Sequence, residues 1–319
     1  MRKILILSPH LDDAVLSCGD LIYKYVKMGY TVDVLTIFSG SVNKKYLSEA
    51  AKQFHSNCFL DHNAMHYRKI EDKKAHDFLG CSSLYLDELE CLYRRDKAGY
   101  IYPDLNNIYH LERTREKESI KSLSNKLSDI VKKYDIVYAP MGLGEHADHL
   151  MTNESIKLVD GNFELYFYEE VAYVCYYYRD NILSNWGNGM KYKLIEINEE
   201  EYNKKISAIL LYRSQLRILW ENRIQFESEM EKFSKKYGDK RYMRVWYNET
   251  NKWIFNNKNW TRKNILQWTW NKVYILWKSL WDIIKTLEKR KAYSKKSIMP
   301  WRRIWTFNKC WADYITSTF

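Results

Sequence analysis

The chain opens with a short apolar run that stops at a cluster of polar residues, and this feature constrains the fold more than any other. Residues 4–7 are all aliphatic, and a proline, His10, Asp12 and Asp13 follow them closely. An apolar run of this length, ended by a proline, predicts a buried strand of a parallel sheet. Such a strand delivers a histidine and two carboxylates to its carboxyl end, which suits a metal site.

The first 250 residues predict alternating strands and helices. We expect strands over residues 3–7, 31–38, 82–86, 135–139, 165–169 and 193–197, and helices over 14–28, 46–79, 112–133 and 199–236, with Gly29 ending the first helix. Repeated strand–helix units imply an α/β fold, in which a mostly parallel sheet carries helices on both faces. No GxGxxG motif follows the first strand, so a dinucleotide is not favoured as ligand.

A second polar cluster, which contains His146, Asp148 and His149, lies just after the strand expected over 135–139. Ligands of parallel sheets bind outside the carboxyl ends of the strands, so both clusters are expected at the same edge. Taken alone, the two adjacent aspartates of the first cluster could instead cap the following helix. The second cluster makes that interpretation insufficient.

Zinc in a catalytic site takes three protein ligands and leaves one position for water. We expect His10, Asp13 and His149 to bind Zn²⁺. Asp12 is then free to act as the general base that takes a proton from water. His146 in its protonated form would stabilise the oxyanion, and Asp148 would orient a histidine.

Residues 8–19 together with residues 146–149 resemble the PIG-L/LmbE family of zinc-dependent N-acetylglucosaminyl deacetylases. The similarity covers about residues 1–250 and continues in residues 68–80, 135–140, 166–169 and 205–215. It implies a Rossmann-like fold and removal of the N-acetyl group from a GlcNAc-containing glycan precursor, glycolipid or secondary metabolite. It also implies that Asp148 partners His146 or His149, and that the N-acetylated sugar is contacted by Arg68, Ser17 and Asp96.

The chain departs from the family pattern at three positions. Leu11 and Ala14 stand where the family has a proline and a glutamate, but neither of those is a metal ligand. Some relatives place a tyrosine just before the second cluster to assist the oxyanion, and Gly144 stands there in this chain. Any second donor must therefore come from elsewhere.

The last 69 residues differ from the rest in composition. Residues 251–319 contain 15 Lys and Arg against 3 Asp and Glu, and 9 of the 12 tryptophans. We expect two parts, a deacetylase domain over 1–250 and a basic, Trp-rich helical extension over 251–319. Apolar residues from 266 to 287 recur at helical spacing. This face either packs on the domain or its copy in a homo-oligomer, or contacts an anionic membrane that carries a lipid-linked substrate. No recognised motif supports nucleic-acid binding.

The remaining features predict a cytoplasmic protein, which could also associate peripherally with the inner face of the membrane. Six scattered cysteines are expected as free thiols, and no run of the sequence reads as a signal peptide or a membrane span. A membrane- or partner-binding scaffold with a residual metal site is the alternative function. We expect His62 and His66 to form either a second metal site or a pair of exposed histidines on a helix. We expect residues 212–215 to form either a packed helix face or a pocket wall.

Overall fold

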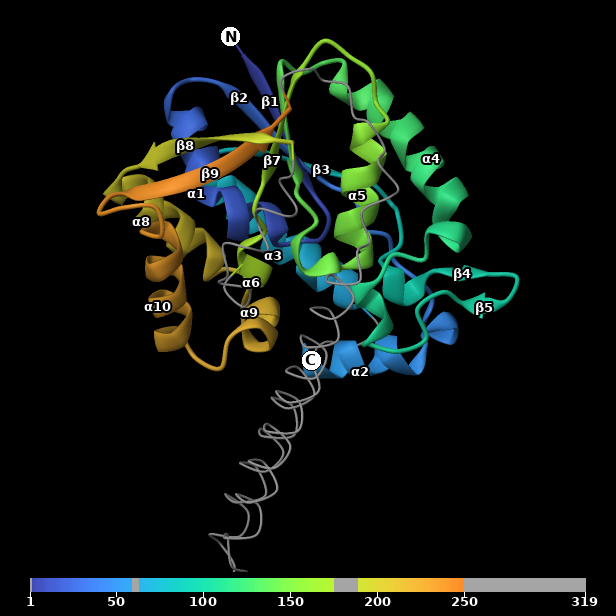
Figure 1. The fold of residues 1–319 in the computed structure, drawn as a ribbon. Helices are drawn as coiled ribbons and strands as arrows, with labels where there is room; N and C mark the ends of the chain where they lie inside the picture. The colour runs from blue at the N-terminus through green and yellow to red at the C-terminus, as the bar shows by residue number, and fades with distance from the viewer. Residues whose placement is uncertain (1, 59–62, 175–188, 249–319) are drawn as a thin grey trace, which may run out of the picture. The chain divides into compact units, whose positions relative to one another are not determined.

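The computed structural model describes residues 2–58, 63–174 and 189–248 (Figure 1). In these ranges the chain forms a seven-stranded sheet of order β3-β2-β1-β6-β7-β9-β8 and a two-stranded hairpin, β4-β5. The strands are β1 (Lys3–Ser8), β2 (Thr31–Thr36), β3 (Ser82–Tyr85), β4 (Arg95–Asp96), β5 (Gly99–Tyr100), β6 (Ile136–Pro140), β7 (Glu164–Tyr168), β8 (Lys191–Ile197) and β9 (Arg241–Tyr247).

Helices cover both faces of the sheet, as predicted. They are α1 (Asp13–Lys27), α2 (Glu49–Asn57), α3 (Ala64–Leu79), α4 (Arg113–Val131), α5 (Ala147–Lys157), α6 (Val171–Val174), α8 (Glu199–Ile209), α9 (Arg213–Leu219) and α10 (Arg223–Ser234), with single 3₁₀ turns η1 (Lys44–Tyr46), η2 (Cys91–Tyr93), η3 (Asn107–Tyr109) and η4 (Leu143–Glu145). Helix α1 packs on α8 and α3, and α4 packs on α5. Figure 1 shows these two groups on opposite sides of the strands.

The centre of the sheet is parallel and fully buried. Strand β1 lies between β2 and β6, and Ile4 pairs with Val32 on one side and Ile136 on the other. Residues 4–8 of β1 and all of β6 are buried, which explains their near-continuous apolar sequences. The chain runs outward from β1 through β2 to β3 and then returns to the far side of β1 as β6. The strand order therefore reverses between β1 and β6, where such sheets bind ligands.

The expected helix over 199–236 is wrong, because the structure divides it into α8, α9 and α10. Tyr212 lies at the first break, and its hydroxyl donates to Asp72 of α3 at 2.8 Å. Ser214 binds Glu71 of α3 through its backbone N–H (3.1 Å) and its hydroxyl (2.6 Å). The second break precedes α10, where the side chain of Asn222 accepts the backbone N–H of Gln225. Long-range contacts and a cap thus override the helical pattern.

The far edge of the sheet also differs from the expectation. Strand β9 was not predicted, and it runs antiparallel to both β7 and β8. The range predicted as helix over 46–79 contains η1, α2 and α3, with residues 59–62 outside the described ranges. Gly29 follows α1 with a φ of 81°, as expected for a helix end. The predicted extension over 251–319 lies outside the described residues.

Candidate metal and catalytic site

The loop after β1 is folded tightly by its own polar groups. The hydroxyl of Ser8 donates to the carbonyl of His10 at 2.7 Å and accepts the backbone N–H of Ala14 at 3.0 Å. The backbone N–H of His10 donates to Asp13 Oδ2 at 2.8 Å. These bonds hold the end of β1 against the start of α1, so that His10 and Asp13 lie at the same end of the sheet.

The second cluster begins α5, directly after β6 and η4. His146 is the N-cap of α5, and its Nδ1 accepts the backbone N–H of Asp148 at 3.2 Å. The side-chain amide of Asn153, farther along α5, donates to the carbonyl of Pro140 at 2.8 Å and so ties the helix to the end of β6. Because β1 and β6 are neighbours, the two clusters meet at the point where the strand order reverses.

The three residues expected to bind zinc lie together. Asp13 Oδ2 is 3.1 Å from His10 Nδ1 and 3.2 Å from His149 Nε2. Ligands held at zinc distances of ~2.0–2.1 Å in a tetrahedron are separated by roughly 3.3 Å, which is close to these spacings. His149 Nε2 is buried and has no hydrogen-bond partner of adequate geometry among the described residues. The donor types, the spacing and this orphaned nitrogen fit a zinc ion.

The protonation states of His10 and His149 depend on the negative charge of Asp13. Burial alone lowers the pKa of His149, but the nearby carboxylates of Asp13 and Glu170 raise that pKa to about 9. Burial likewise lowers the pKa of His10, and its bonds to Asp13 and Asp148 raise it well above the usual value. Burial would raise the pKa of Asp13, yet the two histidines hold it well below its usual range. A bound metal ion would take the place of the histidine protons.

His146 is also within reach of a metal ion, since ligand atoms of His10, His146 and His149 lie within 4.8 Å of one another. Its Nδ1, however, already accepts the N–H of Asp148. Burial and the positive charge of His10 lower the pKa of His146 well below the usual value. The ring is therefore neutral with its hydrogen on Nε2, which makes it a donor. The expected role of His146 toward the oxyanion needs only this donor and stays a prediction.

Asp148 has a different partner from the expected one. Its Oδ2 lies 2.9 Å from Nε2 of His10, rather than against the ring of His146 or His149, because its side chain points back toward the loop after β1. The same oxygen accepts the backbone N–H of Cys91 at 3.0 Å. Asp148 therefore orients His10, an expected metal ligand, and directs its Nδ1 toward Asp13.

Two further groups hold the site in place, and the sequence did not reveal them. Glu170, two residues beyond β7, lies 3.2 Å from His149 Nδ1 and accepts the backbone N–H of Gly142 at 2.6 Å. Arg94 binds the other oxygen of Asp148, and its Nε donates to Glu116 at 2.6 Å. The position of Glu170 just after a strand was an available signal, whereas Arg94 comes from a loop with no recognisable pattern.

Asp12 lies next to Asp13 in the chain, beside the residues expected to bind zinc. The side chain is buried and accepts no hydrogen bond from the described residues. Burial and the charge of Asp13 raise the pKa of Asp12 to about 7, although Arg68 and His10 oppose this shift. A carboxylate with such a pKa exchanges protons readily near neutral pH.

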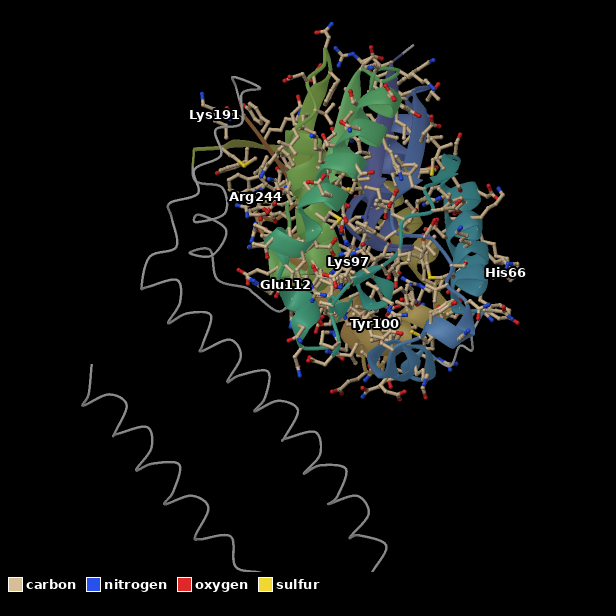
Figure 2. The ribbon with its side chains drawn as sticks, turned by 90° about the vertical axis from the view of Figure 1, so that its right-hand side faces the viewer. His66, Lys97, Tyr100, Glu112, Lys191 and Arg244 are labelled. Atoms are coloured by element: carbon tan, nitrogen blue, oxygen red, sulfur yellow. The ribbon has the colours of Figure 1, made fainter. Side chains whose placement is uncertain are left out.

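The three residues expected to contact the sugar are all engaged by other protein groups. Arg68 is buried, and its Nη1 lies 2.5 Å from Glu90 Oε1. The Ser17 hydroxyl is buried and accepts the backbone N–H of Val171 at 3.3 Å. Asp96 lies on the β4–β5 hairpin, where Arg115 binds both of its oxygens at 2.6 Å. Figure 2 shows Lys97 and Tyr100 of this hairpin on the face turned toward the viewer. Arg68 is nevertheless close enough to Asp12 for its charge to lower the pKa of that carboxyl, and the sugar contacts of the three residues stay predictions.

The other described residues noted in the sequence lie on the surface, at a contact between helices or in the core. His66 is exposed on the outer side of α3 (Figure 2), and His62 lies outside the described residues. Residues 212–215 dock α9 on α3 through the contacts given above. Cys18, Cys58, Cys81 and Cys91 are buried free thiols. Within the described ranges, no helix is long and apolar enough to cross a membrane.

Comparison with known proteins finds a family model that matches nearly half of the chain. Residues 5–159 match the PIG-L family model, described as GlcNAc-PI de-N-acetylase. This segment contains both polar clusters. The 2'-N-acetylparomamine deacetylase of Niallia circulans is 24% identical over 232 residues, which cover 67% of this chain and 81% of that protein.

Solved structures are similar over a longer part of the chain. A deacetylase of the teicoplanin biosynthesis pathway matches with a TM-score of 0.66 and 22% identity, over 76% of this chain and 96% of that one. The A40926 pseudoaglycone deacetylase matches with a TM-score of 0.63 and 25% identity, over 77% of this chain and 96% of that one. The predicted α/β fold is thus confirmed both by the sheet and by its structural neighbours.

Proposed function

Because residues 5–159 form a PIG-L family domain, we propose that this protein is a zinc-dependent hydrolase that removes the N-acetyl group from a GlcNAc-containing glycoconjugate. One observation carries the proposal. Asp13 Oδ2 lies between His10 Nδ1 and His149 Nε2 at tetrahedral spacing, and the neighbouring Asp12 carboxylate accepts no hydrogen bond from the described residues. This arrangement pairs a metal site with a free base.

His10, Asp13 and His149 would hold the ion. Zinc at this point supplies a Lewis acid, which favours loss of a proton from water at neutral pH. The proton of the attacking water passes to Asp12 as the water oxygen bonds to the amide carbon. The carbonyl oxygen gains negative charge and accepts the Nε2–H of His146. The C–N bond then breaks, and Asp12 returns its proton to the amine nitrogen, which leaves a free amine and acetic acid, and the acid loses its proton to water to give acetate.

The substrate class follows from the relatives. One similar protein is a deacetylase of 2'-N-acetylparomamine, and two similar structures are deacetylases of teicoplanin biosynthesis and of the A40926 pseudoaglycone. These names favour an N-acetylated amino sugar of a secondary metabolite. The family description, GlcNAc-PI de-N-acetylase, keeps a glycolipid as the second class.

The test is acetate release by the purified full-length chain loaded with one equivalent of zinc. Suitable probes are 2'-N-acetylparomamine, N,N'-diacetylchitobiose and GlcNAc-phosphatidylinositol. We expect turnover of at least one probe, which Asp12→Asn lowers roughly 10²–10⁴-fold. Asp129→Asn, on the exposed face of α4, is the matched control and should keep full turnover. Failure of the zinc-loaded chain on every probe would favour the scaffold alternative instead.

The division into a domain over 1–250 and an extension over 251–319 stays a prediction from composition. It is supported by the charge of the extension, which contains 15 basic and 3 acidic residues. If this segment contacts anionic lipid, the full-length chain should sediment with vesicles that contain phosphatidylglycerol, and less so at high salt. Equal sedimentation with neutral vesicles would contradict an electrostatic contact.

A further inference from the structure

Tyr173 packs against both histidines of the second cluster. It lies on α6, the single helical turn that follows Glu170, and its ring centroid is 5.2 Å from that of His149 at an interplanar angle of 86°. The ring of His146 is 6.5 Å away at 33°. The backbone N–H of Tyr173 donates to the carbonyl of Glu170 at 3.0 Å, which ties α6 to the partner of His149. The ring is therefore a wall of the candidate site.

Gly144 leaves the space that this ring occupies. A Cβ added at Gly144 would come within 2.4 Å of Cδ1 and 2.5 Å of Cγ of Tyr173. Real Cβ atoms essentially never approach that closely, and the aromatic ring is too rigid to yield in place. The φ of Gly144 is 79°, which also favours glycine. Residue 144 therefore has no side chain, and the ring of Tyr173 on α6 occupies the space where one would lie.

The hydroxyl of Tyr173 is available to a ligand. Among the described residues, no hydrogen bond to it is formed. Burial is the main cause that raises the pKa of Tyr173, and the hydroxyl's electrostatic neighbours are Tyr109, Asp13, Glu170 and Asp12. Asp12, Asp13 and Glu170 are thus near enough to this hydroxyl to act on it electrostatically. Tyr173 is only partly buried, and its hydroxyl is not among the buried polar atoms that lack a partner, so a ligand that enters the site can reach it.

We propose that the Tyr173 hydroxyl is the second hydrogen-bond donor, beside His146 Nε2–H, to the carbonyl oxygen of the substrate amide. This inference rests on the proposed amide hydrolysis. The two donors belong to neighbouring rings, and the rings of both His146 and Tyr173 pack beside His149. Charge that develops on the carbonyl oxygen strengthens both bonds, which lowers the barrier rather than the energy of the bound substrate.

The test separates the hydroxyl from the ring. Tyr173→Phe keeps the aromatic packing on His149 and removes only the donor. We expect kcat to fall roughly 10²-fold with KM within about threefold, while zinc content and thermal midpoint stay at the wild-type values. Tyr67→Phe, on the exposed face of α3, is the matched control and should change nothing. A kcat of Tyr173→Phe within threefold of wild type, or loss of zinc from this variant, overturns the proposal.

A second variant tests whether residue 144 acts through Tyr173. Gly144→Ala should displace the ring and lower kcat, but it should add little further loss in the Tyr173→Phe background, since both changes remove the same donor. Additive losses in the double variant would contradict this link.

A binding measurement keeps this inference separate from the proposed function. Acetate presents the same kind of oxygen to the site, and its affinity for the zinc-loaded full-length chain can be measured by calorimetry without turnover. We expect Tyr173→Phe to weaken acetate binding about tenfold and Tyr67→Phe to leave it unchanged. If the wild type hydrolyses no probe, the proposed function fails, and equal acetate affinity in wild type and Tyr173→Phe rejects the donor role independently.

Discussion

Asp148 Oδ2 lies 2.9 Å from Nε2 of His10, a residue 138 positions earlier in the chain. The contact joins the first turn of α5 to the loop after β1 and fixes the ring of His10 with Nδ1 toward Asp13. The other oxygen of Asp148 binds Arg94, which in turn contacts Glu116. His10, the proposed metal ligand, is thus held by a buried chain of charged groups rather than by its own loop alone.

Asp148→Asn should weaken zinc binding. The amide of Asn has a single oxygen, so it cannot accept hydrogen bonds from His10 and Arg94 on separate oxygens as Asp148 does. The substitution also removes the negative charge that pairs with Arg94. We expect the zinc affinity of the full-length chain to fall about 10–100-fold, measured by competition with a chromophoric chelator. Asp129→Asn, an exposed carboxylate on α4, is the control. Unchanged affinity in Asp148→Asn would show that the contact does not orient His10.

Arg68→Met should destabilise the fold. Arg68 and Glu90 are 2% and 4% exposed, so removing the cation leaves a buried carboxylate unpaired. The expected loss is about 3–5 kcal/mol in the free energy of unfolding, measured by urea denaturation, and Arg68→Met/Glu90→Leu should recover part of it. Lys73→Met breaks an exposed ion pair on the same helix and should cost less than about 1 kcal/mol. If Arg68→Met is as stable as wild type, Arg68 serves the substrate rather than the fold.

His76 should make the fold sensitive to mild acid. Burial lowers the pKa of His76, and Asp72, whose Oδ2 is 3.5 Å from His76 Nδ1, opposes this only in part. The unfolded chain therefore binds the proton more readily, so the contribution of neutral His76 is present above about pH 6.5 and lost as the pH falls below it. His76→Gln should lose less stability than wild type between pH 7.5 and 5.5, measured by urea midpoints. The exposed His66→Gln should behave like wild type, and equal pH dependence in all three proteins would contradict the assignment to His76.

The sequence predicted the part of the fold that local patterns determine. Residues 4–7 and 136–140 are buried on both faces of the sheet, so their apolar runs were unambiguous strands. The two clusters follow these strands directly, and parallel topology then places both clusters at one edge. His10, Asp13 and His149 could be grouped for this reason alone.

What the sequence could not reveal depends on contacts between distant residues. The break between α8 and α9 is stabilised by Tyr212 and Ser214, whose partners Asp72 and Glu71 lie on α3. Asp148 contacts His10 rather than a histidine of its own cluster for the same kind of reason. The packing of Tyr173 beside Gly144 joins two segments that share no motif. A single sequence contains no pattern that signals such pairs.

The most direct test of the central claim compares two adjacent carboxylates, by measuring zinc content and acetate release on the same preparations. Wild type should bind about one zinc per chain and release acetate. Asp13→Asn should lose the zinc, because Asp13 contacts both ligand histidines. Asp12→Asn should keep the zinc and lose turnover roughly 10²–10⁴-fold. Full activity of Asp12→Asn, or full zinc content in Asp13→Asn, would contradict the account.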